Sequence, residues 1–393
     1  MMPPDQVTQR KHQIAAMTLD QETDIVPQIE SIDEMMEILS SCPKGKSPGP
    51  DKLRFDHHHT LGCGRAQLSA EARDFLDELR SVLNLILAAR VPPSVAAMLA
   101  MNEIIALPKG DTGDVRPIGI GNTYRKIASK VVYNKLSAAC AAKGFFYSDV
   151  LQGRFSRKDG YCDEGEPFQK TQHASSVCGI ETIVHLTNMA LSMPGVPPLD
   201  LYTIDAGNAF NQVDRLEGLL QAAHIDRGCL PLIRAMYLEE SSSAFYGCED
   251  GVRTITSRAG FHQGDVLGSL MFCISAQPLI NHICESVMQH FPEAAAAKTV
   301  KINFYVDDGT FVAPHDVMKH IIELLQDADL QRRFGYILNP AKGAYLLGRC
   351  PNREQAHERM DSLIHLGLAP DIIRMHPDNE LVNRRLLKPT TLL

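Results

Sequence analysis

Three aspartates at the ends of apolar strands constrain this sequence more than any other feature. Asp205 follows the apolar run LYTI, and Asp307 and Asp308 stand in the segment FYVDDG. Adjacent carboxylates directly after an apolar strand repel each other unless a cation neutralises them. Mg²⁺ takes oxygen ligands of this kind, commonly one or two carboxylates together with substrate phosphates and water. The alternative is an ordinary hairpin turn, because Asp-Asp-Gly also suits a turn.

The composition is that of a globular protein with more than one lobe. The chain has 393 residues, of which 44% are hydrophobic and 22% are charged. This excludes a wholly disordered or collagen-like chain, and at about 150 residues per domain it predicts two or three lobes. The net charge of −8 argues against a histone-like binder, yet residues 43–54 and 104–135 are locally basic. These clusters indicate either a surface that faces phosphates or solvated helix faces.

Several functional classes are not indicated by the sequence. The ten cysteines include no C-x-x-C pair, which predicts free thiols and not a zinc site or a disulfide scaffold. No signal peptide or membrane span is predicted, because the N-terminus is polar and residues 82–107 are interrupted by Arg90 and two prolines. The three histidines at 57–59 are predicted to form a solvated turn.

Hydrophobic periodicity predicts a mixed order of helices and strands. A capping box at Ser31 begins a short helix to Leu39, and 3.6-residue spacing predicts a helix over 75–87. Residues 1–28 are expected to form a loose arm, and residues 150–172 an exposed polar insertion. Further helices are expected at 124–142, 216–223, 230–238, 267–290 and 317–334, and strands at 104–108, 201–204, 243–246, 252–257, 300–305, 310–312 and 343–347.

The strand-helix-strand-strand-helix-strand order, with an aspartate after the first strand and two in a later hairpin, is that of polymerase palms. The segments KGKSPGPD (44–51), DAGNAFN (205–211), GFHQGD (260–265) and FYVDD (304–308) also stand in a characteristic order. On these segments the sequence from about 44 to 347 resembles the reverse transcriptase family, most closely non-LTR retroelement and group II intron enzymes. Residues 44–51 (KGKSPGPD) resemble the family's K-x-SPGPD loop, and residues 105–118 resemble its fingers hairpin. The resemblance implies that Lys109 and Arg116 bind the phosphates of an incoming nucleotide. The alternative is a basic surface hairpin.

Residues 205–211 (DAGNAFN) match the family's motif A. The match implies that Asp205 ligates the metal ions and that the carbonyl of Ala206 assists. It also places Phe210 as a steric gate, whose ring would collide with a ribose 2′-hydroxyl and select deoxynucleotides. Without the motif, Phe210 would be interpreted as an ordinary core residue.

Residues 260–265 (GFHQGD) match motif B, and residues 304–308 (FYVDD) match motif C. The first match implies that Gln263 and Gly264 contact the template or nucleotide base, although VLGS follows where the family has PLGP. The second implies that Asp307 is a metal ligand, that Asp308 supports it, and that Tyr305 contacts the substrate.

Residues 335–342 (GYILNPAK) resemble motif D, in which Lys342 would be the general acid for pyrophosphate departure. A surface lysine is an equally good interpretation. Residues 366–370 (LGLAP) only partly match the primer grip written L-G-x-P-x-G, and no thumb is recognised after it.

The resemblance implies an α+β fold with polymerase fingers and palm, the palm being a ferredoxin-like βαββαβ core with an antiparallel sheet and the fingers having a helical extension. The expected division is an N-terminal arm and short helix (1–43), fingers (44–198), palm (199–348) and a C-terminal tail truncated before the thumb (349–393). The implied activity is RNA-directed DNA polymerisation, a nucleotidyl transfer with two Mg²⁺ ions, or Mn²⁺ in their place.

The implied partners are an RNA template, a DNA or RNA primer and dNTPs, with no membrane, and a further domain or chain could supply the thumb. Three alternatives stay open: a catalytically silent RNA-binding remnant, an RNA-dependent RNA polymerase and a palm-like nucleotide cyclase. Phe210 disfavours the RNA polymerase, and the fingers motifs disfavour the cyclase. The compartment is unassigned, with cytoplasm and nucleus both open.

Overall fold

The computed structural model describes residues 4–20, 22–62, 68–109, 113, 115–152, 168–174, 176, 178–192, 198–248 and 251–376. The chain forms two compact units, each built from two stretches of sequence. Unit 1 is Met1–Phe145 with Phe210–Ala276, and unit 2 is Phe146–Ala209 with Gln277–Leu393. Both contain helices and strands, which confirms the expected mixture of the two. The division into fingers and palm at residue 198 stays a prediction.

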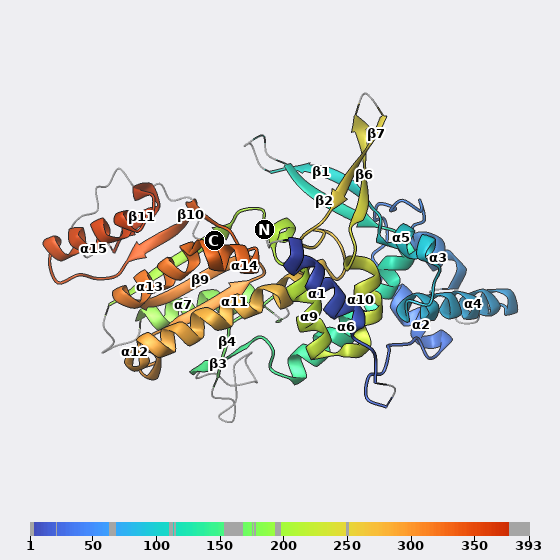
Figure 1. Ribbon diagram of the computed structural model, residues 1–393, viewed down its shortest axis with the longest axis horizontal. Helices are drawn as coiled ribbons and strands as arrows, with labels where there is room; N and C mark the ends of the chain where they lie inside the picture. Colours follow the sequence, from blue (N-terminus) through green and yellow to red (C-terminus); the bar gives the residue numbers. More distant parts are fainter. Residues whose placement is uncertain are drawn as a thin grey trace. The chain divides into compact units, whose positions relative to one another are not determined.

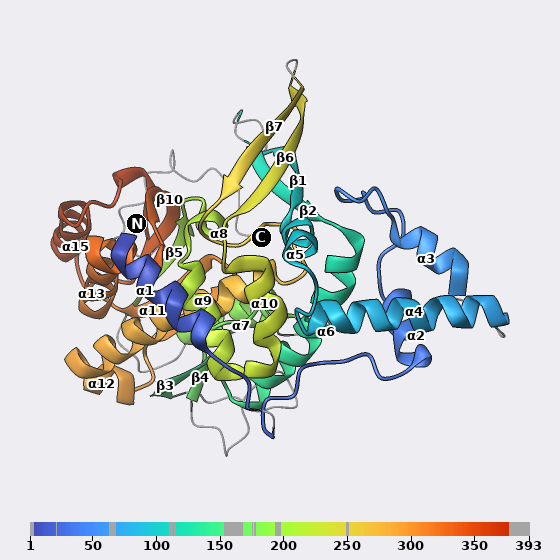
Figure 2. The ribbon, with the colours of Figure 1, turned by 45° about the vertical axis from the view of Figure 1, so that its right-hand side comes forward.

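Unit 1 contains a four-stranded sheet in the order β2-β1-β6-β7. Strand β1 runs parallel to β6, and the other neighbours are antiparallel. Figure 2 shows β6 and β7 as a long hairpin beside β1 and β2. The strands are β1 (Asn102–Pro108), β2 (Val115–Gly121), β6 (Ser241–Cys248) and β7 (Gly251–Ser257), and the helices are α1 (Pro4–Ala16), α2 (Ile32–Ser40), α3 (Phe55–Gly62), α4 (Ala70–Leu87), α5 (Pro93–Ala100), α6 (Thr123–Ala142), α9 (Arg215–Ile225) and α10 (Leu230–Tyr237).

Side chains cap the first turn of several helices of unit 1. Ser31 accepts a hydrogen bond from the Glu34 N–H and begins α2, as its capping box predicts. The Asp51 carboxylate, from the loop at 44–51, accepts from the Thr123 N–H at 2.6 Å. A Cβ on Gly49 would lie 2.1 Å from the Gly121 carbonyl oxygen. This loop therefore closes tightly on the start of α6.

Three expectations for unit 1 are wrong. The predicted loose arm contains α1, which is tied to α9 by an Arg10–Asp214 ion pair of 2.8 Å. The predicted histidine turn lies in α3, with His58 only 4% exposed. In α4, the side chains of Phe75 and Val82 are exposed although both belong to the predicted apolar face. The buried face consists of Leu76, Leu79, Leu83, Ile86 and Leu87.

Unit 2 contains a five-stranded sheet in the order β11-β10-β5-β9-β8. Among the described strands of this sheet, β10 and β11 pair in parallel and the other neighbours are antiparallel. Helix α7 (Gly179–Ser192) packs on this sheet (Figure 1). Its Ala190 contacts Leu199 and Val312. The strands are β5 (Leu199–Ala206), β8 (Lys301–Tyr305), β9 (Asp308–Pro314), β10 (Leu338–Leu347) and β11 (Ile373–Met375), and a separate pair is β3 (Tyr147–Gln152) and β4 (Phe168–Lys170).

The helices of unit 2 differ from expectation at several points, since no helix was predicted at 179–192, 292–296 or 353–365. The helix predicted at 317–334 is two helices, because the Asp327 side chain caps a second one by accepting from the Asp329 and Leu330 N–H groups. Helix α11 begins in unit 1 and ends in unit 2, and α8 also spans the boundary. The helices are α7 (Gly179–Ser192), α8 (Ala209–Gln212), α11 (Gly268–His290), α12 (Pro292–Ala296), α13 (His315–Gln326), α14 (Ala328–Phe334) and α15 (Arg353–His365).

The predicted polar insertion is only partly visible. Residues 153–167 lie outside the described residues. The end of the insertion is not exposed as expected, because Thr171 and Gln172 are fully buried against β8. In the part of the chain that the structure describes, no helix is long and apolar enough to cross a membrane.

Candidate functional site

The predicted carboxylates come together at one edge of the sheet of unit 2. Ile204 of β5 pairs with Gly309 of β9, so the following residue, Asp205, stands beside the start of β9. Tyr305 pairs with Asp308, which leaves Asp307 in the two-residue turn between β8 and β9. The strand register therefore places Asp205 next to the turn that carries the adjacent aspartates.

The turn between β8 and β9 has unusual backbone geometry. Val306, its first central residue, has a φ of +58°. Glycine is the usual residue at such a position, because a β-branched side chain is strained there. Strain of this kind costs about 1–3 kcal/mol and is found mostly at functional sites. The strained residue directly precedes Asp307.

The pKa of the Tyr336 hydroxyl reflects the negative charge near the same turn. Tyr336 is 2% exposed and donates a hydrogen bond of 2.7 Å to the backbone carbonyl of Asp307. Burial raises the pKa of Tyr336 well above its ordinary value, and the carboxylates of Asp307, Asp308 and Asp205 raise it further. All three carboxylates therefore contribute negative potential at one buried hydroxyl.

Lys342 faces the same edge of the sheet. Its Nζ lies 3.5 Å from Oδ2 of Asp205, and both side chains are partly exposed, by 47% and 34%. An exposed ion pair contributes at most about 1 kcal/mol to stability. The pairing of β10 with β5 shifts register between Leu338 and Gly343, and Lys342 stands within this irregularity. Bulges of this kind redirect side chains, commonly next to functional sites.

The donor set at this edge consists of carboxylate oxygens, the ligand type that Mg²⁺ prefers. Among the described residues, no group of three or more His, Cys, Asp or Glu side chains is arranged to hold a metal ion. Mg²⁺ is commonly bound by only one or two carboxylates, with substrate phosphates supplying other ligands. The residues present thus fit a cation that binds together with its substrate. Ala206, whose carbonyl was predicted to assist Asp205 at the metal site, is the last residue of β5 and is buried.

The predicted phosphate-binding cations lie in unit 1, on the β1–β2 hairpin. Arg116 pairs with Leu107 across the hairpin and is exposed, and Lys109 directly follows β1. Most residues of the connecting turn lie outside the described residues. Strand β2 continues to Gly119, which is hydrogen-bonded to the predicted motif B loop.

The motif B loop connects β7 to α11 and is bonded to β2. The Gln263 carbonyl accepts from the Gly119 N–H at 2.8 Å. Gly264 has a φ of +99°, and a Cβ there would lie 2.8 Å from Cγ2 of Ile118. Glycine is therefore required for both the backbone conformation and the close approach. Arg116 of β2 and Gln263 of the motif B loop are distant in sequence, but they lie on two segments that are hydrogen-bonded to each other.

A buried ion pair that the sequence did not predict anchors this loop. Asp265 binds the Arg125 guanidinium and accepts from the Tyr237 hydroxyl at 2.6 Å. Burial opposes ionisation of Asp265, but Arg125 and Tyr237 outweigh it and hold the pKa of Asp265 below its ordinary value. Arg125 was predicted as part of a basic surface, and this is wrong because its side chain is 1% exposed.

Two further lysines of the predicted basic surface on α6 donate hydrogen bonds within unit 1. The Lys126 amine donates to the Ser47 carbonyl at 3.3 Å, and the Lys130 amine donates to the Ser41 carbonyl at 2.9 Å. Burial lowers the pKa of Lys126. These two cations therefore fix the segment before α3 to α6.

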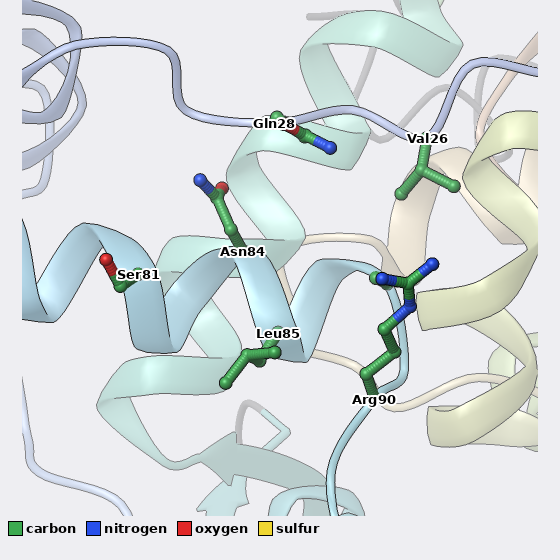
Figure 3. A pocket seen from close by; sticks show the side chains of 7 residues that line it. Val26, Gln28, Ser81, Asn84, Leu85 and Arg90 are labelled. Carbon is green, nitrogen blue, oxygen red and sulfur yellow. The ribbon is translucent and has the colours of Figure 1, made fainter.

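A pocket in the described part of unit 1 lies away from the predicted residues. It is a cavity of about 200 Å³ in unit 1. Figure 3 shows Val26 and Gln28, from the segment before α2, above Ser81, Asn84 and Leu85 of α4. None of the predicted site residues lines it. The residues that line this pocket therefore do not change the assignment of the candidate site.

Comparison with known proteins gave structural similarity only. No protein-family model and no curated protein matches the chain. The chain is similar to a C-terminally truncated apo telomerase from Candida tropicalis, with 14% identity and a TM-score of 0.45 over 71% of this chain and 56% of that one. It is also similar to telomerase from Candida albicans in complex with a fragment of telomeric RNA, with 12% identity and a TM-score of 0.45 over 66% and 44%. The chain thus spans about half the length of these telomerases, and identities this low assign it to no family.

Proposed function

We propose that the chain is the fingers and palm of a reverse transcriptase of the non-LTR retroelement type. The observation that carries the proposal is the meeting of Asp205 with the Asp307–Asp308 turn at one sheet edge, with Lys342 3.5 Å from Asp205. The sheet order β10-β5-β9-β8, in which β5, β8, β9 and β10 are consecutive strands of unit 2, supports a ferredoxin-like palm. The six motifs in family order support the same function.

In this proposal Asp205 and Asp307 hold Mg²⁺, and Asp308 supports them. Mg²⁺ bound there supplies charge stabilisation for the primer 3′-hydroxyl and the leaving pyrophosphate. Lys342 donates a proton to the pyrophosphate, a role that its position beside Asp205 permits. The Ala206 carbonyl and the Tyr305 side chain, which flank the carboxylates in sequence, help to seat the nucleotide.

The proposal also gives roles to residues of unit 1. Lys109 and Arg116 bind the nucleotide phosphates, one as a point charge and the other as a planar fork. Gln263 and Gly264 contact the base of the template or the incoming nucleotide, and Phe210 excludes the 2′-hydroxyl. The proposed substrates are an RNA template, a primer and dNTPs.

Primer extension tests the proposal. We expect the wild type to extend oligo(dT) on poly(rA) with dTTP and Mg²⁺, and Asp307→Asn to extend it at least roughly a hundredfold more slowly, since it loses a metal ligand. The variant should be at least as stable as the wild type, because it also loses carboxylate repulsion.

Asp316→Asn is the matched control, because Asp316 is an exposed carboxylate of the same unit. It should extend primers as the wild type does. Equal extension by wild type and Asp307→Asn would contradict the metal assignment. Extension by neither protein would favour an RNA-binding remnant.

A further inference from the structure

Gln172 is a buried side chain that holds the turn carrying Asp307. Its side-chain nitrogen donates to the Val306 carbonyl at 3.1 Å, and its side-chain oxygen accepts from the Val306 N–H at 3.0 Å. One amide therefore satisfies both backbone polar groups of the strained residue. Gln172 itself is fully buried.

The backbone around Gln172 fixes the amide in place. The Phe304 N–H donates to the Thr171 carbonyl at 2.7 Å, and the His173 N–H donates to the Phe304 carbonyl at 2.8 Å. These bonds attach the segment 171–173 to β8 in parallel. The Gln172 oxygen also accepts from the Ala174 N–H at 3.1 Å, which sets the orientation of the amide group.

The strain at Val306 and the bonds from Gln172 have similar energies. A positive φ at a β-branched residue is strained and persists only where the surrounding structure holds it. A hydrogen bond to a backbone group away from water is of comparable size, because leaving such a group unbonded is costly. The two bonds are therefore large enough to decide whether the turn keeps this conformation. The Tyr336 hydroxyl holds the next carbonyl, that of Asp307.

We infer that Gln172 is a positioning residue, which keeps Val306 at positive φ and so directs the Asp307 carboxylate toward Asp205. The consequence for catalysis rests on the proposed polymerase function, whereas the consequence for cation binding does not. Gln172 touches no reacting atom in this assignment and acts only through the turn.

Gln172→Met removes both hydrogen bonds to Val306, together with the one from the Ala174 N–H, while keeping the length of the side chain. We expect it to lower kcat for dTTP addition by roughly 10- to 100-fold, the usual effect of a residue that orients a metal ligand, with little change in KM. Adding Val306→Gly should restore most of the rate, because glycine adopts positive φ without strain.

Gln169→Met is the matched control. Gln169 is also a buried glutamine of this segment, and it donates to the Ile302 carbonyl of β8 at 2.9 Å, away from the turn. It should lower stability without the kcat loss, and Val306→Gly should not compensate it. Similar kinetic losses for both glutamine variants, or no rescue by Val306→Gly, would overturn the inference.

Terbium luminescence provides a readout that does not depend on polymerisation. The chain contains no tryptophan, so tyrosines sensitise bound Tb³⁺, and Tyr305 and Tyr336 adjoin the carboxylates. We expect Asp307→Asn to abolish a Tb³⁺ site of the wild type, Gln172→Met to weaken it roughly tenfold, and Val306→Gly to restore it. If this pattern holds but the wild type extends no primer, the positioning role stands and the polymerase proposal fails. A wild type without this Tb³⁺ site would overturn the positioning role.

Thermal unfolding keeps the inference testable if Gln172→Met is poorly folded. Gln172→Met should be less destabilising in the Val306→Gly background, since the Gln172 amide then holds no strained residue. Equal destabilisation in both backgrounds would overturn the inference.

Discussion

Phe210 is held within unit 1 by both its ring and its backbone. The ring stacks on Phe272 with centroids 4.8 Å apart, and the carbonyl accepts from the Phe261 N–H at 2.7 Å. A Cβ on Gly260 would lie 2.0 Å from the same carbonyl oxygen, and Gly260 has a φ of +62°. Glycine is therefore required there. A ring whose position is fixed in this way can discriminate between nucleotides by their shape.

Phe210→Ala should raise the use of ribonucleotides relative to deoxynucleotides by roughly 10- to 100-fold, the range for discrimination by steric fit in a pocket. The measurement is the ratio of kcat/KM for dTTP and UTP, which does not depend on how much of the variant is folded. Phe210→Tyr, which keeps a bulky ring, is the control. An unchanged ratio in Phe210→Ala would refute the gate.

The type and order of residues predicted which of them come together, but not which of them are buried. The motifs indicated Asp205 and Lys342 independently, and the structure places them 3.5 Å apart. Arg125 was missed as an anchor because its partner Asp265 is 140 residues away in the chain. Gln172 was missed because it follows a polar segment and has no apolar periodicity around it. Long-range pairing of buried polar groups leaves no local pattern in a sequence.

At the scale of elements, Asp200 connects several parts of unit 2. This fully buried carboxylate of β5 accepts from the Tyr345 hydroxyl of β10 at 2.5 Å and from the Gly348 N–H at 2.7 Å. It also lies 2.7 Å from Nδ1 of His315, whose other ring nitrogen is 3.2 Å from the Ser362 hydroxyl of α15. The network joins the strands that carry Asp205 and Lys342 to α13 and α15.

Asp200→Asn should lower the free energy of unfolding of unit 2 by about 3 kcal/mol, because one partner of a buried charged network is lost. Asp316→Asn, on the exposed side of α13, should change it by less than about 1 kcal/mol. Urea unfolding of both variants checks the difference. Similar values for the two would mean that the network contributes little.

Periodicity predicted the elements better than their ends. The expected helix at 124–142 and the hairpin at 300–312 correspond to α6 and to β8 with β9. The break between α13 and α14 was missed because both segments are apolar on one face, and only the cap at Asp327 separates them. Helix α1 was missed because it contains mostly polar residues and is fixed by ion pairs to α9.

At the scale of the whole molecule, each unit contains a buried histidine that is kept neutral. In unit 2, burial and nearby Lys170 lower the pKa of His173 to about 4. In unit 1, burial and Arg125 lower the pKa of His262 to about 4. An ordinary histidine has a pKa near 6.5. Both groups therefore take up a proton more readily in the unfolded chain.

The two histidines should make both units less stable in mild acid. Between about pH 6.5 and 4 the unfolded chain binds more protons than the folded one, so stability falls as pH falls through this window. Each histidine should contribute a loss of about 3 kcal/mol by pH 4, at 1.36 kcal/mol per pKa unit. His173→Gln should flatten the pH dependence of unit 2, and His262→Asn that of unit 1, in urea unfolding followed from pH 7 to 4. An equally steep loss in the double variant would mean that the acid sensitivity comes from other groups.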